Sequence, residues 1–220
     1  MSGRYIAPEQ GGFRIARRRS WAIAALATGI LILCALWLSP LPGMSRRAFS
    51  PHMILHLGVT VVAAPLIAVG LLNLGKPLAG SSRPLLLAVA ASLFELIVVW
   101  GWHAPAAHEA AAARDPVFVA QQLSFLAAGL GIWTVSFAGA SRASAGIGVL
   151  AMMFTFMHMA MLGILLSLAP DLIYAPMYCL GAWGFEPLED QRLGGALMAV
   201  FGGLPYLFGG IVLAFRLLRE

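Results

Sequence analysis

Two histidines stand four residues apart in the segment SPHMILH, directly before a long apolar run. This spacing places His52 and His56 on one face of a helix, about one turn apart. Imidazoles bind transition metals, transfer protons and ligate haem. Because an imidazole beside hydrocarbon is costly without a partner, the pair indicates a site for one of these ligands. The alternative is plain helix capping, with Ser50 as N-cap and Pro51 as the first helical residue.

Three further histidines and one acid fall in or beside apolar runs. His103 lies in the motif WGWHAP, His108 follows it, and His158 lies in the methionine-rich stretch MMFTFMHMAM. The thioether of Met157 is a soft ligand that suits Cu(I) together with imidazole, although methionine is also ordinary apolar filler. Glu95 is the only acid inside an apolar run, and an intramembrane carboxyl is a functional hypothesis by default. These residues extend the set of candidate ligands.

Composition places these residues in a membrane protein. The 220-residue chain is 60% apolar and 10% charged, with a mean hydropathy of +0.88, whereas a soluble domain carries about 25% charged residues. Runs of about 20 apolar residues predict transmembrane helices. Six such runs occur: Trp21–Leu38, Ile54–Leu72, Leu85–Trp102, Val117–Phe137, Ala145–Ala169 and Gly194–Leu217. The sequence predicts an all-α polytopic membrane bundle, residues 20–220, after a basic segment, residues 1–19.

The basic residues predict that both termini face the cytoplasm. With the N-terminus inside, most of the 14 Lys and Arg residues fall on the cytoplasmic side, although Arg46 and Arg47 fall on the opposite one. The run RIARRRS then contacts anionic lipid, so the net charge of +5 reflects topology and not nucleic-acid binding. All five histidines lie in the outer half of this topology, which indicates an outward-facing site.

Two prolines and one long connection mark departures from regular helix. Pro65 and Pro205 fall inside the second and sixth apolar runs, where we expect them to kink the helices. The longest connection, from Pro170 to Arg192, carries aromatic residues such as Trp183 and Phe185. We expect this segment to lie at the membrane interface as an aromatic belt.

The usual signatures of catalysis are missing from the sequence. It contains no Gly-rich phosphate loop, no nucleophile elbow, no HExxH and no CxxC motif. Its two cysteines, Cys34 and Cys179, make no disulfide framework. The sequence therefore favours a protein that is not an enzyme over a hydrolase or an ATP-driven pump.

An ordered set of motifs resembles a known family. PHMILHLGVTVVAAPLIAVG, then WGWHAP, then LAPDLIYAPMY followed by LEDQRLGG are similar to the hallmarks of the CtaG-type cytochrome c oxidase assembly factors of bacteria. The resemblance covers roughly residues 45–215. It implies a multi-pass protein of the bacterial inner membrane that is needed for maturation of haem–copper oxidases, with copper handling as the usual suggestion. The matching residues are His52, His56, Trp102, His103, Pro105, Asp190, Gln191, Gly194 and Gly195.

One position departs from the family pattern. Many members have Glu-His in the span after the WHxP motif, where this chain has Gln121-Gln122. Glutamine is a poor substitute for either an acid or a strong metal ligand. The departure shifts the expected burden of a metal site to His158 and Glu95.

These observations combine into one expectation, a polar pocket that opens to the outer face and binds Cu(I) transiently. Its expected ligands are His52, His56, His103 and His158, with Glu95 and Met157 in support. A low-coordinate soft site of this kind can release its ion to an oxidase subunit or a copper chaperone. Trp102, Asp190 and Gln191 would border the pocket or meet that partner.

Three alternatives stay open at the level of sequence. Histidines from different spans could ligate a b-type haem. The protein could instead be a metal-free scaffold that binds oxidase subunits, with its histidines as capping residues. A third and weaker alternative is a proton or ion relay through Glu95 and His158.

Overall fold

The structure is a computed structural model that describes residues 9–75 and 83–219. The first eight residues of the expected basic segment therefore lie outside the described part. Within the described residues the chain is helical and has no strand, and six of its helical stretches are long and apolar enough to cross a membrane. The predicted fold class, a helical membrane bundle, is confirmed.

The helices follow one another through short connections. They are α1 (Glu9–Leu38), α2 (Leu41–Ser45), α3 (Phe49–Leu57), the π-helical turn η1 (Gly58–Ala63), α4 (Ala64–Leu74), α5 (Pro84–His103), α6 (Pro105–Ala113), α7 (Asp115–Ala138), α8 (Arg142–Ser167), the 3-10 turn η3 (Pro176–Tyr178), α9 (Pro187–Leu197), the π-helical turn η4 (Met198–Gly202) and α10 (Leu204–Arg219). The second span consists of α3, η1 and α4, and the sixth consists of α9, η4 and α10.

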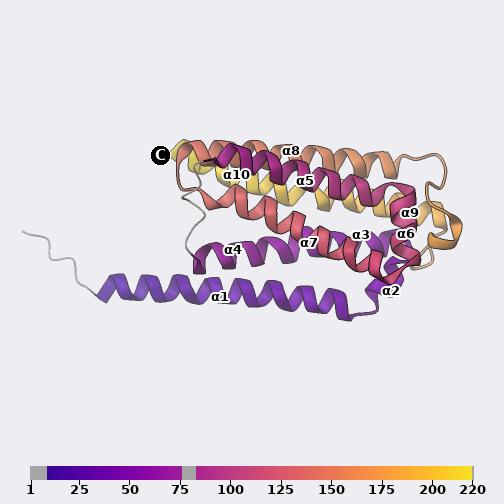
Figure 1. Cartoon of the computed structure of the whole chain (residues 1–220), viewed down its shortest axis with the longest axis horizontal. Coiled ribbons are helices and arrows are strands. Elements are labelled where there is room, and N and C mark those ends of the chain that lie inside the picture. The colour runs from indigo at the N-terminus through magenta and orange to yellow at the C-terminus, as the bar shows by residue number, and fades with distance from the viewer. Residues whose placement is uncertain (1–8, 76–82, 220) are drawn as a thin grey trace, which may run out of the picture.

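The bundle has two different ends. Helix α1 begins and α10 ends at one end, whereas α2, α6, α9 and the connection from α8 to α9 gather at the other (Figure 1). We call this second end the α6 end. The α3–η1–α4 span is the most buried of the six and α1 is the least, lying along α4 at the edge of the bundle.

The two spans that carry polar residues start earlier than their hydropathy indicates. The second begins at Phe49 instead of Ile54, and the sixth begins at Pro187 instead of Gly194. In both cases the added turns hold polar side chains, among them His52 and Asp190, that are buried inside the bundle. Hydropathy assigns such residues to loops because it does not register their buried partners.

Each span proline follows a π-helical turn. Proline lacks the N–H that an α-helix needs, and its ring clashes with the carbonyl one turn earlier. Here η1 ends two residues before Pro65, and η4 ends three residues before Pro205. The wider turn leaves the Thr60 carbonyl without a helical donor, since its i+5 position is Pro65, and Trp133 Nε1 of α7 donates to it at 3.3 Å. The expected break in regular helix is present and takes the form of a π turn.

Glycines allow α8 and the sixth span to pack backbone against backbone. A Cβ on Gly163 of α8 would lie 2.3 Å from the Ala199 nitrogen, and one on Gly195 of α9 would lie 2.4 Å from the Ser167 nitrogen. No side chain other than hydrogen fits at either position, because backbone atoms cannot move aside as a side chain can. This contact fixes α9 against α8 at the α6 end.

Candidate functional site

Four imidazoles meet at the α6 end of the bundle. His52 and His56 come from α3, His103 ends α5, and His108 lies in α6. The ring centres of His52 and His108 are 4.7 Å apart, those of His56 and His103 are 5.4 Å apart, and those of His52 and His103 are 5.5 Å apart. We call these residues the histidine cluster. It joins three of the four predicted ligands to His108.

Most ring nitrogens of the cluster have no hydrogen-bond partner. His103 Nδ1 lies 2.6 Å from the Val99 carbonyl, so this nitrogen carries the proton and Nε2 keeps its lone pair. The buried nitrogens without a partner are His52 Nε2, both nitrogens of His56, His103 Nε2 and His108 Nδ1. Buried polar atoms are normally satisfied, so the cluster has unused capacity to bind.

Aromatic rings enclose the cluster. Phe125 of α7 packs on His56 with 4.0 Å between ring centres, while Tyr174 stacks on Phe49 at 4.9 Å and on His108 at 4.4 Å. The Tyr174 hydroxyl donates to the His103 carbonyl at 3.0 Å. The four imidazoles are therefore buried, whereas the sequence led us to expect a pocket open to the outer face.

Burial keeps the titratable groups of this cover neutral. It lowers the pKa of His108 to about 3, helped by the nearby His103, and it raises the pKa of the Tyr174 hydroxyl above its usual range. His108 thus presents a neutral imidazole, which is the form that binds metals, and Tyr174 presents a protonated hydroxyl that can donate.

Asp190 positions the helix that carries two of the histidines. Its carboxylate accepts from the backbone N–H groups of Phe49 at 2.7 Å and Ser50 at 3.2 Å, and from the Ser50 hydroxyl. The N-cap of α3 is Ala48, which has no side-chain cap, so the expectation that Ser50 is the N-cap is wrong. A carboxylate from α9 caps α3 instead, where the helix dipole favours negative charge.

Gln191 holds the segment that covers the cluster, residues 170–186, which we call the strap. Gln191 Oε1 accepts from the Ile173 N–H at 2.7 Å, and Glu109 Oε1 of α6 accepts from the Ala175 N–H at 2.9 Å. A Cβ on Gly194, one turn after Asp190, would lie 2.5 Å from the Phe49 ring. The DQRLGG motif thus orders the α6 end from within, since both Asp190 and Gln191 are buried.

His158 and Glu95 form a separate pair. His158 Nε2 lies 2.6 Å from Glu95 Oε2, joining α8 to α5, and both side chains are buried. Glu95 precedes His103 by eight residues on α5, which puts the pair about 12 Å deeper in the bundle. Met157 is 66% exposed and lies on the outside of α8. The structure therefore does not bring His158, Glu95 or Met157 into the histidine cluster.

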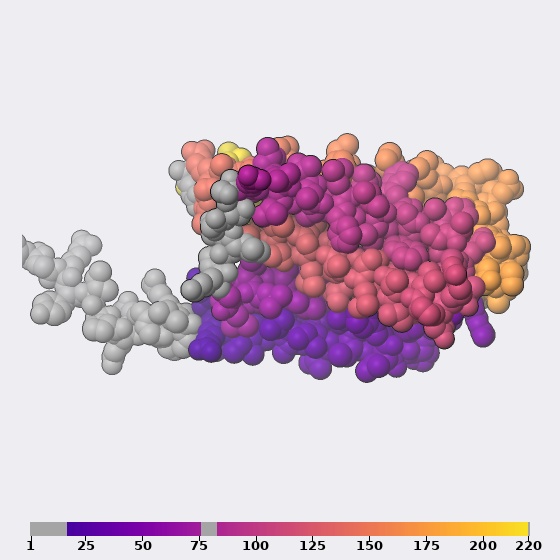
Figure 2. All heavy atoms as spheres, viewed as in Figure 1, coloured from indigo at the N-terminus to yellow at the C-terminus, as the bar shows by residue number. Residues whose placement is uncertain are grey.

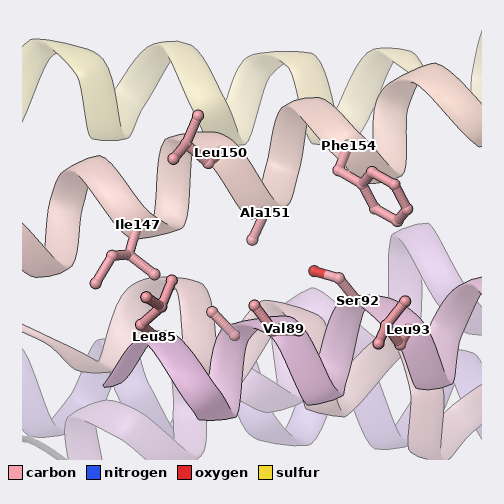
Figure 3. A pocket seen from close by; sticks show the side chains of 9 residues that line it. Leu85, Val89, Ser92, Leu93, Ile147, Leu150, Ala151 and Phe154 are labelled. Carbon is pink, nitrogen blue, oxygen red and sulfur yellow. The ribbon is translucent and has the colours of Figure 1, made fainter. Parts of the chain in front are cut away.

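An apolar cavity of about 270 Å³ lies beside this pair, between α5 and α8 (Figure 3). Ser92, one turn before Glu95, points from α5 toward α8, and Phe154, one turn before His158, closes that end of the cavity. The other lining residues are aliphatic. The cavity belongs to the seam between α5 and α8 and not to the histidine cluster.

Trp102 and the Gln121-Gln122 pair connect α5 to α7 beside the cluster. Trp102 Nε1 donates to Ser124 Oγ at 2.8 Å, and Ser124 Oγ donates to the Gln121 carbonyl at 2.8 Å. Both glutamines are buried, and Gln121 Nε2 and Gln122 Oε1 have no partner. Phe125, which packs on His56, follows Gln121 by one turn, so the two share a face of α7. The departure from the family pattern thus lies next to the cluster.

His108 is the site residue that sequence reasoning undervalued. Its surroundings, PAAHEAAAA, form α6 with Pro105 as first residue, whereas we expected an outer loop. Alanine is the best helix former, and proline is favoured in a first turn. This pattern was the available signal.

The cluster is not a ready-made metal centre. Among residues 9–75 and 83–219, no group of three or more His, Cys, Asp or Glu side chains is arranged to hold a metal ion. The imidazoles are gathered and unpartnered, but their nitrogens do not converge on a common point as they stand.

Comparison with known proteins places the chain in a family. Neither a curated protein nor a solved structure matches it significantly. A family model described as cytochrome c oxidase caa3 assembly factor (Caa3_CtaG) matches residues 10–220. Because that match covers nearly the whole chain, with the motifs that build the α6 end, the protein belongs to the family of cytochrome c oxidase caa3 assembly factors.

Proposed function

We propose that this protein is an assembly factor of the bacterial inner membrane that binds Cu(I) at the histidine cluster. Copper is its cargo, passed to a subunit of the haem–copper oxidase or exchanged with a copper chaperone. The observation that carries the proposal is the set of unpartnered imidazole nitrogens on α3, α5 and α6. Imidazole is a good ligand for copper, and a site with few ligands releases its ion readily.

The spacing of the rings supports this proposal. A metal lies about 2 Å from an imidazole nitrogen and hence about 3 Å from the ring centre, so two rings that share an ion have centres up to about 6 Å apart. The pairs His52–His108, His56–His103 and His52–His103 fall between 4.7 and 5.5 Å. Rotation of the rings about their side-chain bonds can therefore direct two or three nitrogens to one ion without moving a helix.

A metal-free scaffold is the second candidate. The buried Gln121 and Gln122 beside the cluster favour it, because they add no strong ligand. A b-type haem has less support, because the rings of Phe49, Phe125 and Tyr174 already pack around the imidazoles where a porphyrin would have to lie.

Copper content of the purified full-length protein under reducing conditions tests the proposal. We expect the wild type to retain Cu(I) against a chromophoric chelator and the double variant His56→Ala/His103→Ala to lose it. His158→Ala is the matched control, because His158 is an equally buried histidine outside the cluster, and it should keep the ion. Equal copper in the wild type and the double variant, or none in either, would overturn copper binding and leave the scaffold.

A further inference from the structure

The strap exposes a group of large apolar side chains on its outer side. Met177, Leu180, Trp183 and Phe185 are all exposed, and we call them the apolar tip. The strap forms the extreme of the molecule at the α6 end, beyond α6 and α9 (Figures 1 and 2). Its inner side carries Tyr174, which is buried against the histidine cluster. One short segment thus contacts both the cluster and the surroundings of the protein.

The turn that displays Trp183 has an unusual backbone. Trp183 has a φ of 52°, a left-handed conformation that is rare for a bulky residue, between Gly181 at 83° and Gly184 at 87°. A Cβ on Gly181 would lie 2.1 Å from the Phe185 carbonyl oxygen, so the turn is tight and requires glycine there. Strained conformations persist only where the surroundings impose them, and they concentrate at functional sites.

The apolar tip lies beyond the hydrocarbon core. The sixth span has 33 helical residues, about 50 Å at 1.5 Å per residue, whereas the core of a bilayer is about 30 Å thick. Its apolar run begins only at Gly194, so Pro187 and the strap before it project past the membrane. Exposed acids flank the tip at Asp171, Glu186 and Glu189, and they repel the anionic lipid headgroups that would otherwise attract it.

We propose that the apolar tip is the docking surface for a protein that offers an apolar pocket with a basic rim. Trp, Phe and Met are enriched at the centres of protein interfaces, and the acids around the tip complement basic side chains. This inference rests on the proposed function, because the partner in question is the oxidase subunit that receives copper.

Docking at the tip is linked to access to the cluster. Three hydrogen bonds hold the strap down: Ile173 N–H to Gln191, Ala175 N–H to Glu109, and the Tyr174 hydroxyl to the His103 carbonyl. A partner that draws the strap outward breaks these bonds and removes Tyr174 from His108. The surface that recognises the partner is thereby the cover of the site that serves it.

Binding of the full-length protein in nanodiscs to the purified copper-binding subunits of its own oxidase tests the inference. We expect Trp183→Ala to weaken that binding at least tenfold, as loss of a central interface aromatic does. Trp21→Ala is the matched control, since Trp21 is 68% exposed and Trp183 is 54% exposed, but Trp21 lies on α1 at the opposite end. Unchanged affinity of Trp183→Ala, or no measurable binding by the wild type, overturns the docking surface.

A labelling experiment separates a protein partner from the membrane. Met177→Cys in the strap and Met157→Cys on α8 are a matched pair, at 67% and 66% exposure in the wild type. We expect a membrane-impermeant maleimide to react rapidly with Met177→Cys and not with Met157→Cys, and bound oxidase subunit to protect Met177→Cys. Slow reaction of Met177→Cys in nanodiscs without subunit would place the tip in lipid and overturn the proposal.

The two proposals fail in distinguishable ways. Loss of copper binding in none of the histidine variants, with Trp183→Ala still defective in docking, removes the copper function and keeps the docking surface. Copper binding that depends on His56 and His103, with unaltered docking of Trp183→Ala, does the reverse.

Discussion

A single hydrogen bond decides which nitrogen of His103 is available. Because Nδ1 donates to the Val99 carbonyl of its own helix, Nε2 is left as the acceptor. Sequence shows that the histidines are present and that two lie one turn apart. It does not show this tautomer, nor the cap from Asp190 to Phe49 across 141 positions, because both depend on how helices distant in sequence are placed.

His108 makes the stability of the α6 end depend on pH. Its imidazole has a pKa of about 3 in the fold and about 6.5 when unfolded. Between these values the unfolded chain binds more protons, so the free energy of unfolding falls as pH drops below about 6.5. We expect the melting temperature of the wild type in detergent to fall from pH 7.5 to pH 5, and that of His108→Gln to fall less.

Asp171→Asn serves as the control for this pH experiment, because Asp171 is an exposed acid near the same end. It should show the wild-type pH dependence. Identical pH dependence of His108→Gln and the wild type would contradict the assignment of the effect to His108.

At the scale of elements, small residues decide how closely helices approach. Gly129 of α7 leaves no room for a side chain, since a Cβ there would lie 2.9 Å from Ala64 Cβ and 3.1 Å from the Thr60 carbonyl oxygen. The sequence indicates which segments are helices but not which glycines face a neighbour. For the same reason it gave the depth of His158 and not its direction, which leads to Glu95 and away from the cluster.

Two glycines of α8 allow this argument to be tested. Gly163→Ala places a methyl group against the backbone of Ala199, whereas a Cβ on Gly146 meets nothing within 4 Å. We expect Gly163→Ala to lower the free energy of unfolding by about 1–3 kcal/mol through overpacking. Gly146→Ala should leave it unchanged or raise it by up to about 1 kcal/mol, because alanine is the better helix former. Steric-trap unfolding in bicelles measures both, and equal stability of the two variants would contradict the close contact.

At the scale of the whole molecule, hydropathy was sufficient to predict the six spans, because a bilayer rewards apolar length in the same way whatever the packing inside. It was not sufficient for the ends of those spans. The buried Asp190 and Gln191 lower the local hydropathy of α9, yet their partners lie within the α6 end. The strap is likewise no simple interfacial belt, since Tyr174 faces the cluster.

The orientation of the bundle remains a prediction. We expect both termini in the cytoplasm, so a fluorescent protein fused after Glu220 should fold and fluoresce, and an alkaline phosphatase fused within the strap should be active. Arg46, which falls on the outer side, is paired with Asp115 at 2.5 Å. The opposite pattern of reporter activity would turn the histidine cluster toward the cytoplasm.

The π turn before Pro65 also sets the phase of the second span. His52, His56, Thr60, Ala64 and Ala68 recur every four residues, and all five are buried. In an α-helix of 3.6 residues per turn this stripe would drift by about 40° at each step. The wider turn winds it back, so that the histidines and the small residues below them stay on one side. A chain one residue shorter between Gly58 and Ala63 would keep its six spans and its hydropathy, yet it would turn the imidazoles about 100° away from the residues beneath them.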